Sequence, residues 1–317
     1  MAFSNNANTF LASLTNLCLQ VLTFDNLQFT NRFGAFARQY TKWGDKIACV
    51  NAWVADGEDY NASSSTFTNP FNASKPDVVE ATIETKLKKR YSLKLSENIL
   101  RGAFEDENAL AMFLNTLVGQ LRTKAEIDIY AQICNDFATL DLDGQGIGNT
   151  NRNIIGSITT SNNGSAVVEL YTKIIETAQA MKLPNKTYGL TPSGDGDTLS
   201  KEVCAENTRL ILYLSPIAYS RIMTYVDASL LNSSTIALDK WIDEVRVVDI
   251  DINSQAGNDF SEMYGVLCTE DVYRYSPRIE TIREQPNGAD LTLNYFYHLW
   301  TNMGFTGAGQ LAFIGND

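Results

Sequence analysis

The stretch VVEATIETKLKKRYSLKL, residues 78–95, decides how the chain is interpreted. From Val79 to Lys88 the odd-numbered residues are apolar or small and the even-numbered residues are polar, a period of two. The alternation resumes after a basic run with Tyr91, Leu93 and Leu95. Because side chains alternate between the two faces of a strand, this pattern predicts one long strand with one dry and one wet face.

A second strand is predicted just before this one, at Ile47–Ala55. The connection between them, Asp56–Asp77, is rich in Asn, Ser and Thr and contains two prolines. Connections this long are uncommon in compact domains and are either functional or disordered. Together these segments predict an extended hairpin built to contact a neighbouring molecule.

A long helix is predicted at residues 106–138. Asp106 is a suitable N-cap, and acidic residues beside it favour the positive end of the helix dipole. Apolar residues then recur with the spacing of one buried face: Leu110, Phe113, Leu114, Leu117, Val118, Leu121, Ala125, Ile129, Ile133 and Phe137. At 1.5 Å per residue the helix would span roughly 48 Å.

The remaining chain alternates short helices with apolar strands. An amphipathic helix is predicted at Ala166–Lys182, and a buried strand at Arg209–Leu214 runs into a helix that Ser215 caps and Pro216 begins. Further strands are predicted at Ile154–Ile155, Val245–Ile252, Tyr264–Thr269, Tyr273–Glu284, Leu291–Phe305 and Gln310–Ile314. This segregated mixture of helices and strands indicates the α+β class.

Composition excludes several classes of protein. At 317 residues with 44% hydrophobic residues the chain can bury a large core, and its net charge of −12 argues against a strong nucleic-acid binder. Five scattered cysteines without a C-x-x-C pair indicate reduced thiols rather than disulfides or structural zinc. No signal peptide and no apolar run of membrane-spanning length is found, so no membrane partner is expected.

Catalytic chemistry finds little support in the sequence. His298, the only histidine, lies in an aromatic strand and is interpreted as structural. A hydrolase could use paired carboxylates such as Asp195 with Asp197 or Asp249 with Asp251, since alternate strand residues point the same way. Acidic residues are abundant here, however, and nothing raises these above the background. We expect no enzymatic activity, no cofactor and no metal.

The densest basic region is Lys86, Lys88, Lys89, Arg90, Lys94 and Arg101. A solvated strand face is the commonest meaning of such a run. The functional alternative is charge complementarity with an acidic surface on an adjacent copy. DNA binding ranks third, because few aromatic residues are interleaved with the cations in the sequence.

In order, these elements resemble the major capsid protein of tailed bacteriophages, with the HK97-like (Hong-Kong-97-type) capsid fold. The similarity lies in element order over nearly the whole chain, including NTRLILYLSPIAYSRI (207–222) and DLTLNYFYHLWTNMGFTGAGQLAFI (290–314). It implies the following division: an N-terminal arm at 1–44, an extended hairpin loop at 45–96, a peripheral domain at 97–149 and 286–317 with its spine helix at 106–138, and an axial domain at 150–285.

The resemblance also implies a function and partners. The expected function is self-assembly, through hexamers and pentamers, into an icosahedral head shell that encloses double-stranded DNA and contacts it weakly. A separate scaffolding protein, a portal and decoration proteins are the further expected partners, and the protein is expected in the virion after assembly in the host cytoplasm. An encapsulin-like cargo compartment is the alternative. Intersubunit contacts are expected at Phe10, Leu14, Leu17, Phe67, Phe71, Lys75, Lys88, Lys89 and Arg90.

Overall fold

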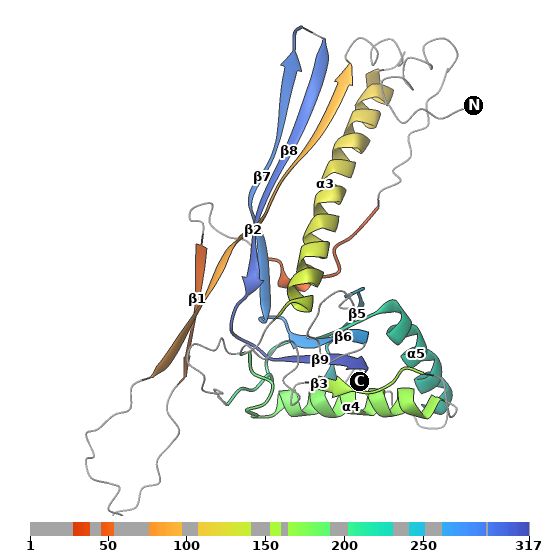
Figure 1. The fold of residues 1–317 in the computed structure, drawn as a ribbon. Coiled ribbons are helices and arrows are strands. Elements are labelled where there is room, and N and C mark those ends of the chain that lie inside the picture. The colour runs from red at the N-terminus through yellow and green to blue at the C-terminus, as the bar shows by residue number, and fades with distance from the viewer. Residues whose placement is uncertain are drawn as a thin grey trace, which may run out of the picture. The chain divides into compact units, whose positions relative to one another are not determined.

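The computed structural model describes residues 28–38, 46–53, 76–96, 107–140, 153–159, 164–190, 202–230, 241–250, 262–289 and 291–316. Figure 1 shows the elements in these ranges. The helical elements are η1 (Gly34–Phe36), α3 (Glu107–Ala138), α4 (Ser165–Lys182) and α5 (Pro216–Leu230). The strands are β1 (Lys46–Trp53), β2 (Asp77–Ser96), β3 (Asn153–Ile155), β4 (Leu210–Leu214), β5 (Glu244–Val247), β6 (Glu262–Thr269), β7 (Tyr273–Asn287), β8 (Thr292–Phe305) and β9 (Leu311–Asn316).

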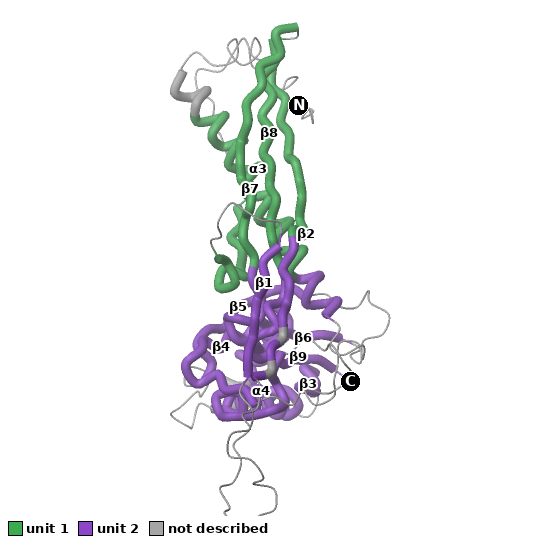
Figure 2. The backbone as a smooth tube through the Cα atoms, turned by 90° about the vertical axis from the view of Figure 1, so that its left-hand side faces the viewer, with its two compact units in different colours: residues 1–45, 85–133, 275–303 green, residues 46–84, 134–274, 304–317 purple. Residues whose placement is uncertain are grey.

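The chain divides into two compact units (Figure 2). Unit 1 contains residues 1–45, 85–133 and 275–303, and unit 2 contains residues 46–84, 134–274 and 304–317. The predicted domains divide the chain differently, since they place all of 286–317 with the spine helix. In the structure β9 belongs to a sheet with β3, β4, β5 and β6, all in unit 2.

Unit 1 combines a sheet with a long helix. Strands β2, β8 and β7 lie side by side in that order, and α3 runs along one face of them (Figure 1). The predicted alternation is present in β2, where the even-numbered residues from 80 to 94 are exposed and Leu87 and Leu95 are buried. Period-two patterning therefore directs one face of this strand toward the helix.

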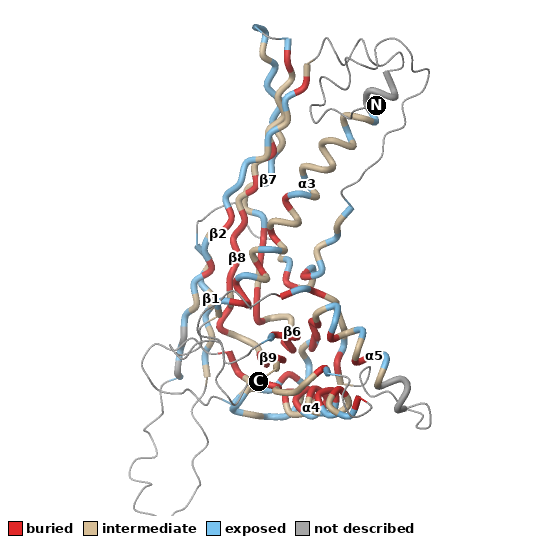
Figure 3. The backbone as a smooth tube through the Cα atoms, turned by 45° about the vertical axis from the view of Figure 1, so that its right-hand side comes forward, coloured by how far each residue is buried: buried red, intermediate tan, exposed pale blue. Residues whose placement is uncertain are grey.

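Helix α3 begins one residue after its predicted start and ends where predicted. The C-terminal part of its apolar face is buried as expected, with Ala125, Ile129 and Ile133 at most 1% exposed. The N-terminal part differs from the prediction, because the apolar residues described between 113 and 121 are only half-buried (Figure 3). The described residues of unit 1 do not fully cover this part of the helix.

Residues 28–38, within the predicted N-terminal arm, pack on unit 1. Phe33 and Phe36 are fully buried, and the Phe33 ring lies 5.5 Å from that of Tyr130 on α3. The Arg38 amide donates a hydrogen bond of 3.0 Å to the Tyr275 carbonyl. This end of the arm is therefore anchored on its own subunit. The predicted helix at Phe10–Leu22 lies outside the described residues.

The predicted hairpin is present as β1 paired antiparallel with the first part of β2. The register runs from Lys46 opposite Glu84 to Trp53 opposite Asp77. Strand β1 ends two residues before the predicted Ala55. The connection at residues 54–75 lies outside the described part of the chain.

Unit 2 contains a five-stranded sheet with the order β3-β9-β6-β4-β5. Helices α4 and α5 pack on it, and the predicted inward face of α4 is buried, as Figure 3 shows. All five residues of β4 are buried, which explains its continuous apolar run. The Ala218 amide donates to Ser215 Oγ at 3.3 Å, so Ser215 caps α5 as predicted.

One predicted strand is too long. Strand β5 ends at Val247, five residues before the predicted Ile252. Asp249 therefore lies beyond the strand, on an exposed position, and the alternation argument for pairing it with Asp251 does not apply. Asp195, Asp197 and Asp251 lie outside the described residues.

Within the described ranges, no helix is both long and apolar enough to cross a membrane. The same part of the chain contains no group of three or more His, Cys, Asp or Glu side chains placed to bind a metal ion.

Candidate intersubunit surface

Three of the nine predicted contact residues lie in the described structure. Lys88, Lys89 and Arg90 are consecutive residues of β2 in unit 1. The other six, Phe10, Leu14, Leu17, Phe67, Phe71 and Lys75, lie outside the described residues. The candidate surface is therefore built here from β2 and its neighbours.

Lys88 and Arg90 point away from α3 and rest on aromatic rings of β8. The Lys88 ammonium lies 5.4 Å from the centre of the Trp300 ring, and the Arg90 guanidinium lies 5.6 Å from that of Phe296. A cation over an aromatic face is attracted by the ring quadrupole, with about 0.5–1 kcal/mol gained at exposed sites. These contacts hold both cations close to the sheet while leaving them exposed.

Two further residues extend this surface. The Arg278 guanidinium of β7 lies 6.0 Å from the Trp300 ring centre. His298 lies between Phe296 and Trp300 on the same face of β8, with its ring 6.5 Å from that of Phe296. We call Lys88, Arg90, Arg278, Phe296, His298 and Trp300 the cation–aromatic face. A surface pocket of about 460 Å³ at this face is lined by Arg90, Phe296 and His298 together with Arg283, Glu284 and Gln285.

Lys89 has a different environment from its two neighbours. Its ammonium lies 2.9 Å from Asp128 Oδ2 of α3, within the same unit. Tyr91 donates a hydrogen bond of 2.5 Å to the same oxygen. Lys89 thus joins the hairpin strand to the spine helix of its own chain, and its ammonium is already engaged in the single subunit.

Burial and hydrogen bonding act in opposite directions on Asp128. Burial raises the pKa of its carboxyl, but the hydrogen bonds from Tyr91 and Lys89 outweigh burial and leave the pKa below its ordinary value. The pKa of Tyr91 is raised, first by burial and then by its bond to the Asp128 carboxylate. Asp128 is therefore ionised, and Tyr91 neutral, near neutral pH.

The sequence indicated the cations of this surface but not their aromatic partners. Few aromatic residues are interleaved with the basic run along β2, which is why nucleic-acid binding ranked low. In the structure the aromatic partners of these cations come from the neighbouring strand β8 instead. The detectable signal was the spacing of Phe296, His298 and Trp300 at every second residue of one predicted strand.

Comparison with solved structures identifies the fold. A chain in the capsid structure of Staphylococcus phage Andhra aligns with a TM-score of 0.70 at 11% identity, covering 95% of this chain and 88% of that one. A chain of the mature capsid of bacteriophage PhiM1 gives 0.58 at 7% identity, with 95% and 92% covered. A chain of Mycobacterium phage Che8 gives 0.53 at 10% identity, with 94% and 97% covered. The fold is the HK97-like fold of tailed-phage capsids.

The family follows from the sequence. The family model of the Phi29-like phage major capsid protein matches residues 1–307, nearly the whole chain. The chain belongs to this family. No curated protein matches the sequence.

The family and the fold settle the class of function. The chain is a structural, shell-forming capsid protein of the phage virion rather than an enzyme, and it assembles with copies of itself. The hydrolase considered from the sequence is thereby set aside, and so is the encapsulin-like compartment.

Proposed function

We propose that the cation–aromatic face is a subunit contact of the head shell and binds an acidic surface of an adjacent copy. The observation that supports this is a cluster of cations held on aromatic rings in a chain of net charge −12. Opposite charges on contacting surfaces select the partner and orientation more than they add affinity. In such a contact the face sets the register between neighbours.

The shell architecture is part of the same proposal. Hexamers and pentamers of this chain form an icosahedral head, because closed assemblies of identical subunits repeat one contact by symmetry. The hairpin loop at 45–96 and the arm at 1–44 both make contacts between subunits. The arm contacts a neighbour through Phe10, Leu14 and Leu17. The hairpin loop contacts a neighbour through Phe67, Phe71 and Lys75.

The remaining domains and partners complete the proposal. Residues 97–149 and 286–317 form the peripheral domain and 150–285 the axial domain, with β9 at the end of the peripheral segment pairing with strands of the axial one. A separate scaffolding protein guides assembly in the host cytoplasm, with a portal at one vertex and decoration proteins on the shell. The double-stranded genome is contacted weakly, which the negative net charge favours.

Charge substitutions on the face test this proposal. Replacing Lys88 and Arg90 with glutamine should leave the subunit folded, since each cation contributes only about 0.5–1 kcal/mol to it. Assembly, followed by light scattering and electron microscopy, should require a higher protein concentration than for the wild type. The variant Lys88→Arg with Arg90→Lys keeps both charges and should assemble nearly normally.

Salt provides the second measurement. Because exposed charges are screened at about 8 Å in physiological salt, wild-type assembly should weaken as salt rises, and the glutamine variant should respond less. Wild-type assembly behaviour of the glutamine variant at all salt concentrations would refute the proposed contact. Preferential binding of a short DNA duplex by the wild type over the variant would instead assign the face to the genome.

A further inference from the structure

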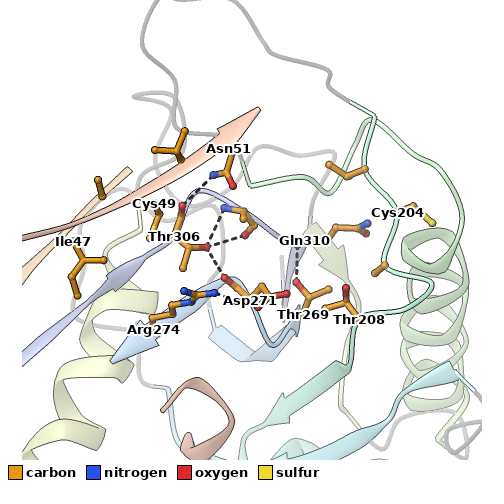
Figure 4. Close-up of a pocket in the computed structure, with 16 residues that line it drawn as sticks. Ile47, Cys49, Asn51, Cys204, Thr208, Thr269, Asp271, Arg274, Thr306 and Gln310 are labelled. Atoms are coloured by element: carbon orange, nitrogen blue, oxygen red, sulfur yellow. Dashed lines mark hydrogen bonds and ion pairs between the residues drawn. The ribbon is translucent and has the colours of Figure 1, made fainter. Parts of the chain in front are cut away.

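Unit 2 contains a cavity beside strand β1 (Figure 4). Its volume is about 580 Å³, within the usual range of ligand-binding pockets. Five consecutive residues of β1, 47–51, line one side. The other sides come from residues 203–208, 269–274 and 306–310, which are distant in sequence.

The outer edge of β1 is open in the described chain. Strand β1 is the terminal strand of its sheet, with β2 on its only paired side. Side chains of a strand alternate between two faces, so an unbroken run of five lining residues places the strand's backbone along the cavity. An unpaired edge presents N–H and C=O groups that another strand can bind. Asn51 Nδ2 donates to the Thr306 carbonyl at 3.3 Å, which fixes this strand next to the cavity.

Gln310 presents a buried donor without a partner at the same cavity. The residue is 1% exposed, lines the cavity, and its Nε2 makes no hydrogen bond. Its Oε1 accepts a hydrogen bond from Asn185 Nδ2 at 3.4 Å. If the Gln310 amide were flipped, its NH₂ group would face the NH₂ group of Asn185. The hydrogen bond therefore identifies Nε2 as the Gln310 atom that lacks a partner. Buried donors are almost always paired, so this one indicates a missing acceptor.

Arg274 supplies a second such donor. Its Nε is buried and makes no hydrogen bond, while its Nη2 lies 3.8 Å from Asp271 Oδ1. Both residues line the cavity, as Figure 4 shows. Two unsatisfied N–H groups and an open strand edge therefore border one space. An extended chain with an oxygen-bearing side chain would satisfy both features.

We propose that an extended segment of a second copy of this chain occupies this cavity in the shell, adding as a strand to the outer edge of β1. Oxygens of its Asp, Glu, Asn or Gln side chains accept hydrogen bonds from Gln310 Nε2 and from Arg274 Nε. This rests on the proposed architecture of the head shell. A second copy is the favoured occupant, since the chain carries 37 Asp and Glu residues that can supply the acceptor oxygens and is surrounded by copies of itself in the shell.

Hydrogen exchange of β1 tests strand addition. Peptides covering residues 46–53 are compared between shells and subunits dissociated from them, by mass spectrometry. Strand addition pairs the amides on the outer edge, so we expect part of β1 to exchange at least tenfold more slowly in the shell, a factor that corresponds to one hydrogen bond of ordinary strength.

Alkylation of Cys49 with iodoacetamide is the companion measurement, because Cys49 lines the cavity and Cys134 does not. Slower exchange together with slower alkylation of Cys49 relative to Cys134 supports the proposal. Slower alkylation with unchanged exchange overturns it, since the cavity is then covered without strand pairing. Normal shells in which both rates are unchanged also overturn it, and leave the proposed shell function standing. If the protein forms no shell under any condition, both the strand-addition proposal and the proposed shell function are refuted.

A substitution identifies the side-chain contact. Gln310→Met keeps the approximate size of the side chain and removes the donor. It also removes the Oε1 acceptor, but Asn185 Nδ2 keeps its shorter hydrogen bonds to the Ala180 and Leu183 carbonyls. We expect the protein concentration needed for assembly to rise about tenfold, as for the loss of one hydrogen bond, while the urea midpoint of the free subunit stays near that of the wild type. Gln132→Met makes the same change on α3, which contributes no residue to the cavity lining, and should assemble normally. Assembly of the Gln310 variant at the wild-type concentration would overturn the role of this donor.

Discussion

Replacing Asp128 with asparagine tests how the spine helix is joined to the hairpin strand within unit 1. Asp128 Oδ2 accepts from Tyr91 at 2.5 Å and lies 2.9 Å from the Lys89 ammonium. Asparagine keeps an oxygen that can accept from Tyr91 but removes the charge. The substitution therefore weakens both contacts without opening a cavity.

The expected cost follows from these two contacts. A hydrogen bond to a charged group contributes about 1.5–3 kcal/mol, against about 0.5–1.5 kcal/mol for a neutral pair. The Lys89 side chain is 46% exposed, so its ion pair adds about 0–1 kcal/mol. Asp128→Asn should lower the free energy of unfolding by about 1–2 kcal/mol.

The assay is equilibrium urea unfolding of the free subunit for wild type, Asp128→Asn, Tyr91→Phe and the double variant. Because both side chains meet in one hydrogen bond, the double variant should lose about 1 kcal/mol less than the sum of the single losses. Additive losses within about 0.3 kcal/mol would refute the claim that these residues act together. The slope of the urea transition should stay unchanged, since the surface exposed on unfolding is the same.

The same comparison has a defined pH dependence. The pKa of Asp128 is lower in the folded chain than its ordinary value of 3.8, so the unfolded chain binds the proton more readily. Its contribution is therefore fully present above about pH 4 and is lost as pH falls through the folded pKa. The stability difference between wild type and Asp128→Asn should shrink below pH 4. A difference that widens there would contradict the assignment of Asp128 as the ionised partner.

Two further predictions concern packing within unit 2 and the helix of unit 1. Gly265→Ala should destabilise by about 1–3 kcal/mol, because the new methyl group would overlap the Tyr213 carbonyl oxygen on the adjacent strand. Gly119→Ala is the matched control, with open space around the new methyl group, and should stabilise α3 by about 0.5–1 kcal/mol, both measured by urea unfolding. Phe137→Leu should cost about 1–3 kcal/mol, since its ring lies 5.6 Å from that of Tyr273 and 5.2 Å from that of Phe305. An unchanged melting temperature for the leucine variant would show that these ring contacts contribute little.

Local periodicity was sufficient for the longest elements. The alternation around Ile83 and Leu87 places both side chains on the buried face of β2. The spacing of Ile129 and Ile133 likewise describes the buried part of α3. Both patterns depend only on neighbours a few residues away, which is why their ends were predicted to within one or two residues.

The candidate surfaces required information that local patterns do not contain. Lys88 and Arg90 were recognised as cations, but their contacts with Trp300 and Phe296 depend on how β2 pairs with a strand about 200 residues later. His298 was interpreted as structural because it lies in an aromatic strand, and its position beside Arg90 and Arg283 at one pocket depends on the same long-range pairing. The cavity beside β1 is likewise formed by three distant turns, and no motif marks them.

The route of the chain through the two units has a consequence for engineering this protein. Four of the five passages of the chain between the units lie inside β2, α3, β7 and β8, and the fifth lies directly before β1. No single cut and no circular permutation yields either unit as a continuous polypeptide, so expressing one unit alone requires its three chain segments to be joined by new linkers. Foreign peptides for display are better inserted where no element is interrupted. The short connection between β7 and β8 is such a place, since Gly288 has open space around it and Leu291 is 58% exposed.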